Sequence, residues 1–212
     1  MAYGCWDEDL PFAQYIDRCK RLQYLRDLAV DNEALTPKDL VELCKTPKLE
    51  SLVVKNFKIP EDIEFTPYQG RPPANLKRLE IIRTTSLPMG PVVEMIFNYI
   101  PKLKSLFWTL ETQYYSIWFK PNDISQALPP LKASLLDLHL LLVDSWGFCN
   151  DQQLDFSDFV ALERLEINER FMLARNYAAT FPQHCREDLF ERLPPSLKTL
   201  KVISCCHVGY SF

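Results

Sequence analysis

A short apolar spacing, Leu-x-x-Leu-x-apolar, recurs seven times along this chain of 212 residues and restricts its fold more than any other feature. The copies span residues 25–30, 49–54, 76–81, 103–108, 135–140, 162–167 and 197–202. Their first positions are separated by 24, 27, 27, 32, 27 and 35 residues. Such self-similarity is typical of repeat proteins, in which a unit is too small to bury its own apolar face and packs on its neighbours.

Within each copy, the fourth and sixth residues fall on the same face of an extended strand, because successive side chains of a strand point to opposite sides. The stacked copies therefore predict a parallel sheet whose apolar face is covered by the segments that lead from one strand to the next. Three of these segments carry helix signals. Thr36 and Pro37 begin a helix as N-cap and first-turn residue, and residues 91–100 and 186–193 are predicted as further helices stopped by proline.

Several copies also share the residues between their apolar positions, as in LKRLEI, LKSLFW, LERLEI and LKTLKV. These segments resemble the leucine-rich-repeat family, and the resemblance covers roughly residues 22–203. It implies an α/β leucine-rich-repeat solenoid: a curved parallel sheet of about seven strands, with helices and irregular returns on its convex side.

A signature of that family is an Asn that follows the strand and bonds neighbouring turns. Asn32 and Asn56 lie near this place, whereas later copies carry Arg83, Glu111 or Ser145. Together with helical returns and irregular repeat lengths, this pattern is similar to the degenerate leucine-rich repeats found behind F-box domains, particularly in fungal proteins. We expect one leucine-rich-repeat domain over residues 1–212, made of an N-terminal helix or partial repeat (1–24), the repeats (25–203) and a C-terminal tail (204–212).

Charge and targeting signals indicate the cellular compartment of the chain and the classes of partner that it is expected to lack. The 24 Lys and Arg residues against 28 Asp and Glu residues give a formal net charge of −4, without the basic excess that nucleic-acid binding normally needs. No apolar run approaches the roughly 18 residues that span a bilayer, and the start MAYGCWDEDL lacks the features of a signal peptide. Seven scattered cysteines indicate reduced thiols. We expect an intracellular protein, cytoplasmic or nuclear, without nucleic-acid or membrane partners.

The sequence carries no phosphate-binding loop, nucleophile elbow or His-Glu-x-x-His zinc motif. Its one cluster of soft metal ligands is Cys205, Cys206 and His207, with His184 and Cys185 earlier in the chain. A zinc site or a thiol nucleophile is one interpretation of this cluster, and buried or terminal thiols are the favoured one. We therefore predict no enzymatic activity, no cofactor and no metal.

Side-chain alternation sends the third, fifth and seventh residues of each copy to the face opposite the apolar one, which is the concave face of the expected solenoid. An apolar centre with a charged rim is typical of protein-binding surfaces. The predicted protein-binding residues on this face are Arg78, Glu80, Ile82, Phe107, Asp137, His139, Leu141, Arg164 and Glu166. Thr109 and Asn168 are expected to be exposed on the same face. An alternative to partner binding is that the apolar side chains of Ile82, Phe107 and Leu141 pack beneath a long loop that folds over the sheet. The aromatic insertion at residues 114–119 either binds a partner or packs as a hydrophobic cluster against the flank of the solenoid.

The expected function is that of a non-catalytic protein–protein interaction scaffold that binds a partner protein, of unknown identity, on the concave face. The fungal resemblance implies an alternative, in which the repeats are the substrate-recognition part of an F-box-type (SCF) ubiquitin ligase subunit and belong to a ubiquitin-ligase complex. This chain carries no F-box of its own, so the resemblance assigns no residue to adaptor binding.

Overall fold

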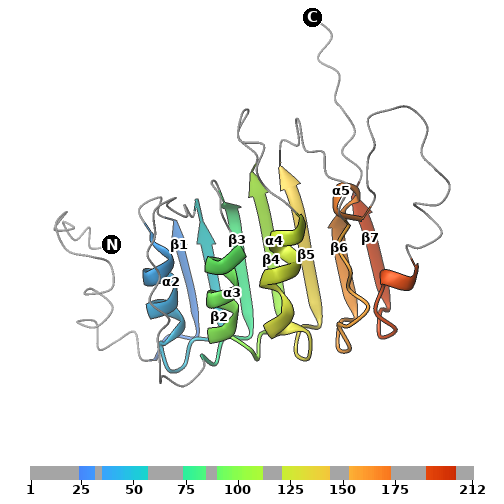
Figure 1. Cartoon of the computed structure of the whole chain (residues 1–212). Helices are drawn as coiled ribbons and strands as arrows, with labels where there is room; N and C mark the ends of the chain where they lie inside the picture. The colour runs from blue at the N-terminus through green and yellow to red at the C-terminus, as the bar shows by residue number, and fades with distance from the viewer. Residues whose placement is uncertain are drawn as a thin grey trace, which may run out of the picture.

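The computed structural model of the chain describes residues 24–31, 35–56, 74–84, 90–111, 121–143, 153–172 and 190–203. The strands in these ranges are β1 (Asp27–Asp31), β2 (Ser51–Lys55), β3 (Arg78–Thr84), β4 (Ser105–Glu111), β5 (Asp137–Val143), β6 (Arg164–Asn168) and β7 (Thr199–Ile203). They form one open sheet in which spatial order follows chain order and every neighbouring pair is parallel (Figure 1). Each strand begins at the third residue of one of the seven copies of the spacing. The predicted α/β fold with a parallel sheet of seven strands is confirmed.

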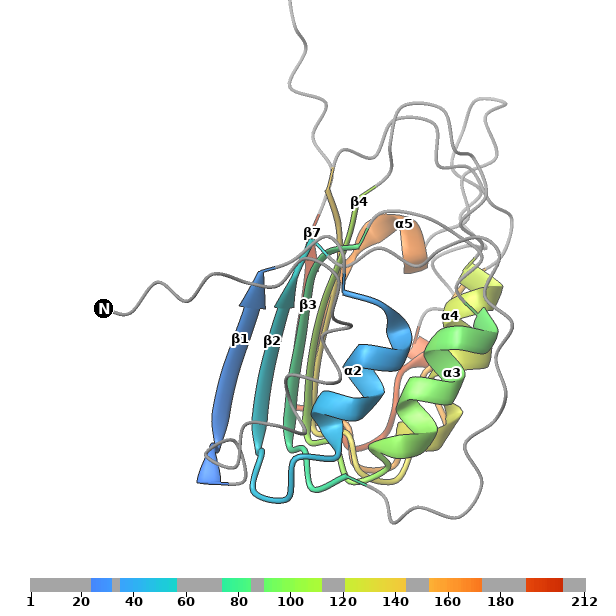
Figure 2. The ribbon, with the colours of Figure 1, turned by 90° about the vertical axis from the view of Figure 1, so that its left-hand side faces the viewer.

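The described helices are α2 (Pro37–Cys44), α3 (Gly90–Tyr99), α4 (Pro121–Ala127) and α5 (Glu169–Met172), with 3-10 turns η2 (Pro129–Leu131) and η3 (Phe190–Arg192). Viewed along the sheet, α2, α3, α4 and α5 all lie on the same side of the strands (Figure 2). We call the opposite side of the sheet the helix-free face. Parallel strands need such crossovers because each chain must return to the same end of the sheet. None of the helices described combines the length and apolarity needed to cross a bilayer.

The structure confirms two of the three predicted helices, and it describes the third predicted segment only from residue 190. Thr36 caps α2 in a capping box: its hydroxyl oxygen accepts from the Asp39 N–H, and the Asp39 carboxylate accepts from the Thr36 N–H at 3.0 Å. Helix α3 falls within one residue of its predicted bounds. Where the third helix was expected, the described part is only the 3-10 turn η3, two residues before a Pro-Pro pair that blocks helix continuation. Helix α4 was not predicted.

Each strand from β2 to β7 begins with the same hydrogen-bond arrangement, in which one carbonyl oxygen of the preceding repeat accepts from two successive backbone N–H groups. The Lys77 carbonyl, for example, accepts from the N–H groups of Lys104 at 2.8 Å and Ser105 at 3.0 Å. The same pair of bonds occurs at all six junctions between neighbouring strands. The acceptors are the carbonyls of Arg26, Glu50, Lys77, Lys104, Leu136 and Glu163. This shared entry fixes a register in which equivalent positions of neighbouring copies stand side by side.

Asn56 ends β2 in a left-handed conformation, with φ at 56°, which asparagine tolerates better than most residues. Its side-chain amide donates to the Asp31 carboxylate at 2.7 Å, and its backbone N–H donates to the Ile82 carbonyl at 2.9 Å. One residue therefore ties β2 to both of its neighbours at the carboxyl ends of the strands.

The core lies between the sheet and the helices and is filled by the fourth and sixth residues of the copies. The fourth-position leucines of β2 to β6 are buried, and Trp108 packs edge to face on Phe97 of α3 at a ring separation of 6.0 Å. The last copy differs, because Leu200 and Val202 are 37% and 45% exposed. The prediction that these two side chains are interior is wrong: β7 is the edge strand of the sheet and packs against one neighbouring strand where inner strands have two.

Candidate functional site

The nine predicted binding residues all lie on β3 to β6, at positions that alternate with buried core residues. The register places Glu80, Phe107, His139 and Glu166 in one row across the sheet. A second row contains Asp137 beside Arg164, with Arg78 two strands away. Strand pairing thus brings residues that are 27 or more positions apart in the chain onto one continuous surface, the helix-free face.

Five of the nine form a contiguous group, together with Lys201 of β7; we call Phe107, Asp137, His139, Arg164, Glu166 and Lys201 the His139 cluster. His139 is its centre. Its Nδ1 lies 2.9 Å from Glu166 Oε2, and its Nε2 lies 3.0 Å from Asp137 Oδ1. The ring of Phe107 lies on its other side, with 5.5 Å between ring centroids and a tilt of 38°.

Two cations complete the cluster on its outer side. Arg164 Nη2 lies 3.0 Å from Asp137 Oδ2, and Lys201 Nζ lies 2.7 Å from Glu166 Oε1. Each carboxylate therefore faces His139 with one oxygen and a cation with the other. The result is a network of charges across β5, β6 and β7 that holds its members in place on the sheet surface.

The contacts of Glu166 lower its pKa and set the direction of its hydrogen bond with His139. The hydrogen bond from Lys201 is the main cause that holds the pKa of Glu166 below its usual range; the charges of Lys201 and His139 add to it and partial desolvation opposes it. Because an ionised carboxylate can only accept hydrogen bonds, the Nδ1 of His139 is the donor in its bond to Glu166. Asp137 Oδ1 is shielded from solvent and has no hydrogen-bond partner among the described residues; it lies close to the His139 ring.

Within the described part of the chain, no hydrogen bond, ion pair or ring contact joins the remaining four predicted residues to this cluster, although Glu80 stands beside Phe107 in the strand register. Arg78 and Glu80 pair with each other along β3, with Arg78 Nε donating to Glu80 Oε1 at 2.8 Å. Ile82 and Leu141 are half-buried apolar side chains near the carboxyl ends of their strands. The prediction that all nine lie on one face agrees with the strand register, but direct contacts unite only five of them.

Thr109 and Asn168 were expected to be exposed on this face, and both are buried. Thr109 lies opposite the register shift in β3 between Ile81 and Thr84, where regular alternation between the two strands is lost. Asn168 is the last residue of β6, and the chain turns directly into α5 toward the core. Lys201, in contrast, is the fifth residue of its copy, so side-chain alternation placed it on this face, but it was not selected as a predicted binding residue.

The contacts of the His139 ring determine where its two nitrogens are directed. A general base must direct a nitrogen at the proton that it removes. Both ring nitrogens of His139 already face carboxylate oxygens of the same sheet. Among the residues that the structure describes, no group of three or more His, Cys, Asp or Glu side chains has an arrangement that could hold a metal ion.

Of the seven cysteines predicted to be reduced thiols, one lies in the described residues. Cys44, on α2, is buried, and burial raises its pKa to about 12, so that the thiol stays protonated at neutral pH. The candidate ligands Cys205, Cys206, His207, His184 and Cys185, and the aromatic insertion at 114–119, lie outside the described residues.

Comparison of the chain with protein-family models and with curated proteins gave no match.

Proposed function

We propose that this chain is a leucine-rich-repeat protein that acts as a non-catalytic recognition module, and that it docks a partner protein on the helix-free face. The observation that carries the proposal is the His139 cluster, a preorganised set of charges beside an aromatic side chain. The seven repeats with one common strand entry, and the bonds of Asn56 to both neighbouring strands, support the repeat family.

The exposure of the cluster indicates what a partner would meet. Arg164 and Lys201 are 62% and 64% exposed, whereas the side chains of Asp137 and Glu166 are 15% and 19% exposed. The two cations therefore retain N–H groups that face solvent, while the carboxylates beneath them fix their positions. A partner that offers carboxylates to these cations finds them already ordered, which lowers the entropic cost of binding.

Apolar side chains supply the second part of the docking surface. Phe107 lies against His139, and Ile82 and Leu141 are half-buried on the flanking strands. A partly desolvated aromatic side chain beside ordered charges is typical of the residues that dominate binding energy. The partner expected from this chemistry has an apolar contact patch with acidic residues at one side of it.

The test is quantitative co-purification from the native cells of the protein, with the wild-type chain and three variants as bait. Phe107→Ala removes the apolar anchor, and Arg164→Glu reverses an exposed charge of the cluster. The matched control is Lys38→Glu, because Lys38 is exposed on α2, across the sheet from the helix-free face, and its reversal changes the net charge equally. Thermal unfolding confirms that each variant is folded.

We expect proteins captured by the wild type to fall by at least roughly tenfold with Phe107→Ala and with Arg164→Glu, and to be retained by Lys38→Glu. Equal capture by all four baits would overturn the proposal. The F-box alternative stays a prediction, and co-purification of cullin-type ligase subunits with the wild-type bait would test it.

A further inference from the structure

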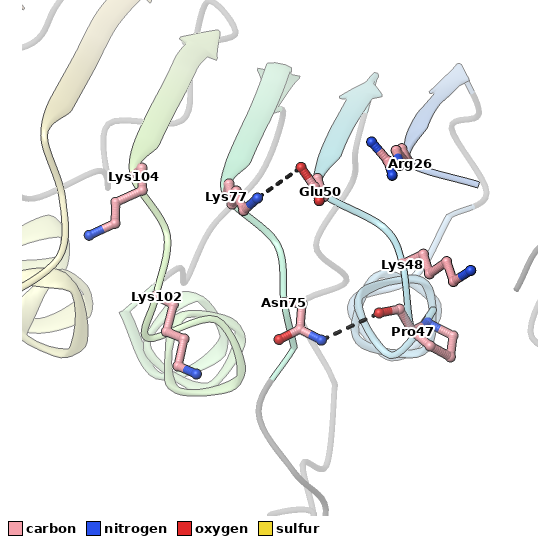
Figure 3. A pocket seen from close by; sticks show the side chains of 8 residues that line it. All are labelled: Arg26, Pro47, Lys48, Glu50, Asn75, Lys77, Lys102 and Lys104. Atoms are coloured by element: carbon pink, nitrogen blue, oxygen red, sulfur yellow. Dashed lines mark hydrogen bonds and ion pairs between the residues drawn. The ribbon is translucent and has the colours of Figure 1, made fainter. Parts of the chain in front are cut away.

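A groove of about 460 Å³ lies outside the helix-free face, at the edge of the sheet where β1 to β4 begin (Figure 3). It is lined by Arg26, Pro47, Lys48, Glu50, Asn75, Lys77, Lys102 and Lys104. Five of these eight residues are cationic and one is anionic, although the whole chain has a formal net charge of −4. The groove is therefore a local positive site on an acidic protein.

The repeat explains why the cations gather here. Arg26, Lys77 and Lys104 are the residues immediately before β1, β3 and β4, and the common strand entry aligns these positions along the edge of the sheet. Lys48 and Lys102 occupy a second equivalent position, two residues earlier. At that position other copies carry polar side chains that bond to the preceding repeat: Asn75 to the Pro47 carbonyl at 3.3 Å, Ser134 to the Leu103 carbonyl and Ser196 to the Leu162 carbonyl at 2.8 Å.

The cations are divided into two groups by an ion pair. Glu50 accepts from Lys77 at 2.9 Å, and this bond and the charge of Lys77 hold the pKa of Glu50 below its usual range. Arg26 and Lys48 lie on the β1 side of the pair, and Lys102 and Lys104 lie on the β4 side (Figure 3). Within the described part of the chain, neither Lys102 nor Lys104 makes an ion pair, and Lys48 lies over the Tyr24 ring at 4.9 Å.

We propose that this groove binds an extended acidic peptide segment of a partner protein, with two acidic pairs separated by a short neutral spacer. The distance from β1 to β4 is three interstrand spacings, about 14 Å at roughly 4.8 Å each, and an extended peptide covers it in about four residues. Two acidic pairs with two neutral residues between them therefore reach both cationic groups and avoid the carboxylate of Glu50.

The observations favour a peptide over other anions. The lining cations are exposed side chains without a buried donor, so they attract extended charge but do not enclose a single phosphate. The chain has a formal net charge of −4 and lacks the basic excess that binding of a nucleic acid normally needs. Because exposed charges are screened by salt, binding is expected to be weak and to depend strongly on ionic strength.

The test is fluorescence anisotropy of the full chain with a labelled peptide, Glu-Glu-Ser-Ser-Glu-Glu, and an isomer in which the four glutamates are contiguous. The double variant Lys102→Glu/Lys104→Glu removes one cationic group. Its matched control is Lys38→Glu/Lys55→Glu, which lowers the net charge by the same amount at exposed lysines outside the groove. The neutral variant Lys102→Gln/Lys104→Gln repeats the measurement if the reversed variant unfolds.

We expect the groove variant to bind the spaced peptide at least roughly tenfold more weakly than the control variant does, and the contiguous isomer to bind the wild type more weakly than the spaced peptide. Three results would each overturn the proposal: no measurable binding by the wild type at low salt, equal affinity of the two double variants, or equal affinity for the two peptides. Tighter binding of a single-stranded oligonucleotide, or displacement of the peptide by inorganic phosphate at matched ionic strength, would overturn the choice of ligand. Phe107→Ala should bind the peptide normally, so this test is separate from that of the helix-free face.

Discussion

Leu138 and Leu200 occupy the same position in two copies of the repeat, and the structure predicts very different costs for replacing them with alanine. Leu138 is 0% exposed and stands between the equivalent leucines of β4 and β6. Its truncation removes the transfer free energy of a full leucine side chain and leaves a cavity, which together cost about 3–4 kcal/mol. Leu200 is 37% exposed on the edge strand, so its truncation loses part of that transfer term, leaves little enclosed cavity and costs about 1 kcal/mol.

The measurement is urea unfolding of both variants and the wild type, followed by tryptophan fluorescence, with the slope m compared to establish that the same transition is observed. Native-state hydrogen exchange gives a second reading. In a linear array of repeats, an edge unit opens without the rest, so the amides of β7 should exchange faster than those of β5. Equal losses of unfolding free energy in the two variants would refute the reasoning, because burial would then not distinguish equivalent positions of the repeat.

Two further predictions follow from titratable groups. At pH 8 the buried thiol of Cys44 should remain unalkylated by iodoacetamide in the native chain and react fully in denaturant. Mass spectrometry of the peptide that contains Cys44 measures the alkylation. Fast labelling of the native chain would contradict the raised pKa of this thiol. The folded-state pKa of Glu166 is lowered, so its ionised form contributes stability at neutral pH that is lost as the pH falls through and below the ordinary value of about 4.3. The difference in unfolding free energy between the wild type and Glu166→Gln should therefore shrink from pH 7 toward about pH 3, and a constant difference would count against the assigned contacts.

Local chemistry was enough to predict much of the fold. The apolar spacing located all seven strands, because side chains alternate between the two faces of a strand with a period of two residues, and this pattern can be recognised in a short stretch of sequence. The cap of α2 was also readable, since Thr36 and Asp39 bond to each other's backbone within one turn. Helix α4 was missed because its segment, PNDISQA, has a single large apolar side chain, Ile124, and lacks an apolar stripe of helical period.

The candidate site was predictable as a set of positions but not as a set of contacts. Alternation placed Asp137, His139 and Glu166 on one face. The contacts within the His139 cluster join residues up to 35 positions apart, as for Lys201 and Glu166. They depend on which positions become neighbours across strands. The segments between repeats vary in length, so the spacing of the copies along the chain does not by itself show which residues of neighbouring strands are paired.

The sequence by itself determined the strand positions, the direction of most of their side chains and the start of α2, because each depends on neighbours within a few residues. Only the tertiary structure decided that Leu200 is partly exposed while Leu138 is buried, that Asn168 turns inward, and that four lysines and an arginine gather in one groove. These outcomes depend on the number of strands beside each repeat and on the alignment of successive strand entries. Both are properties of the assembled sheet, and no single copy of the repeat contains them.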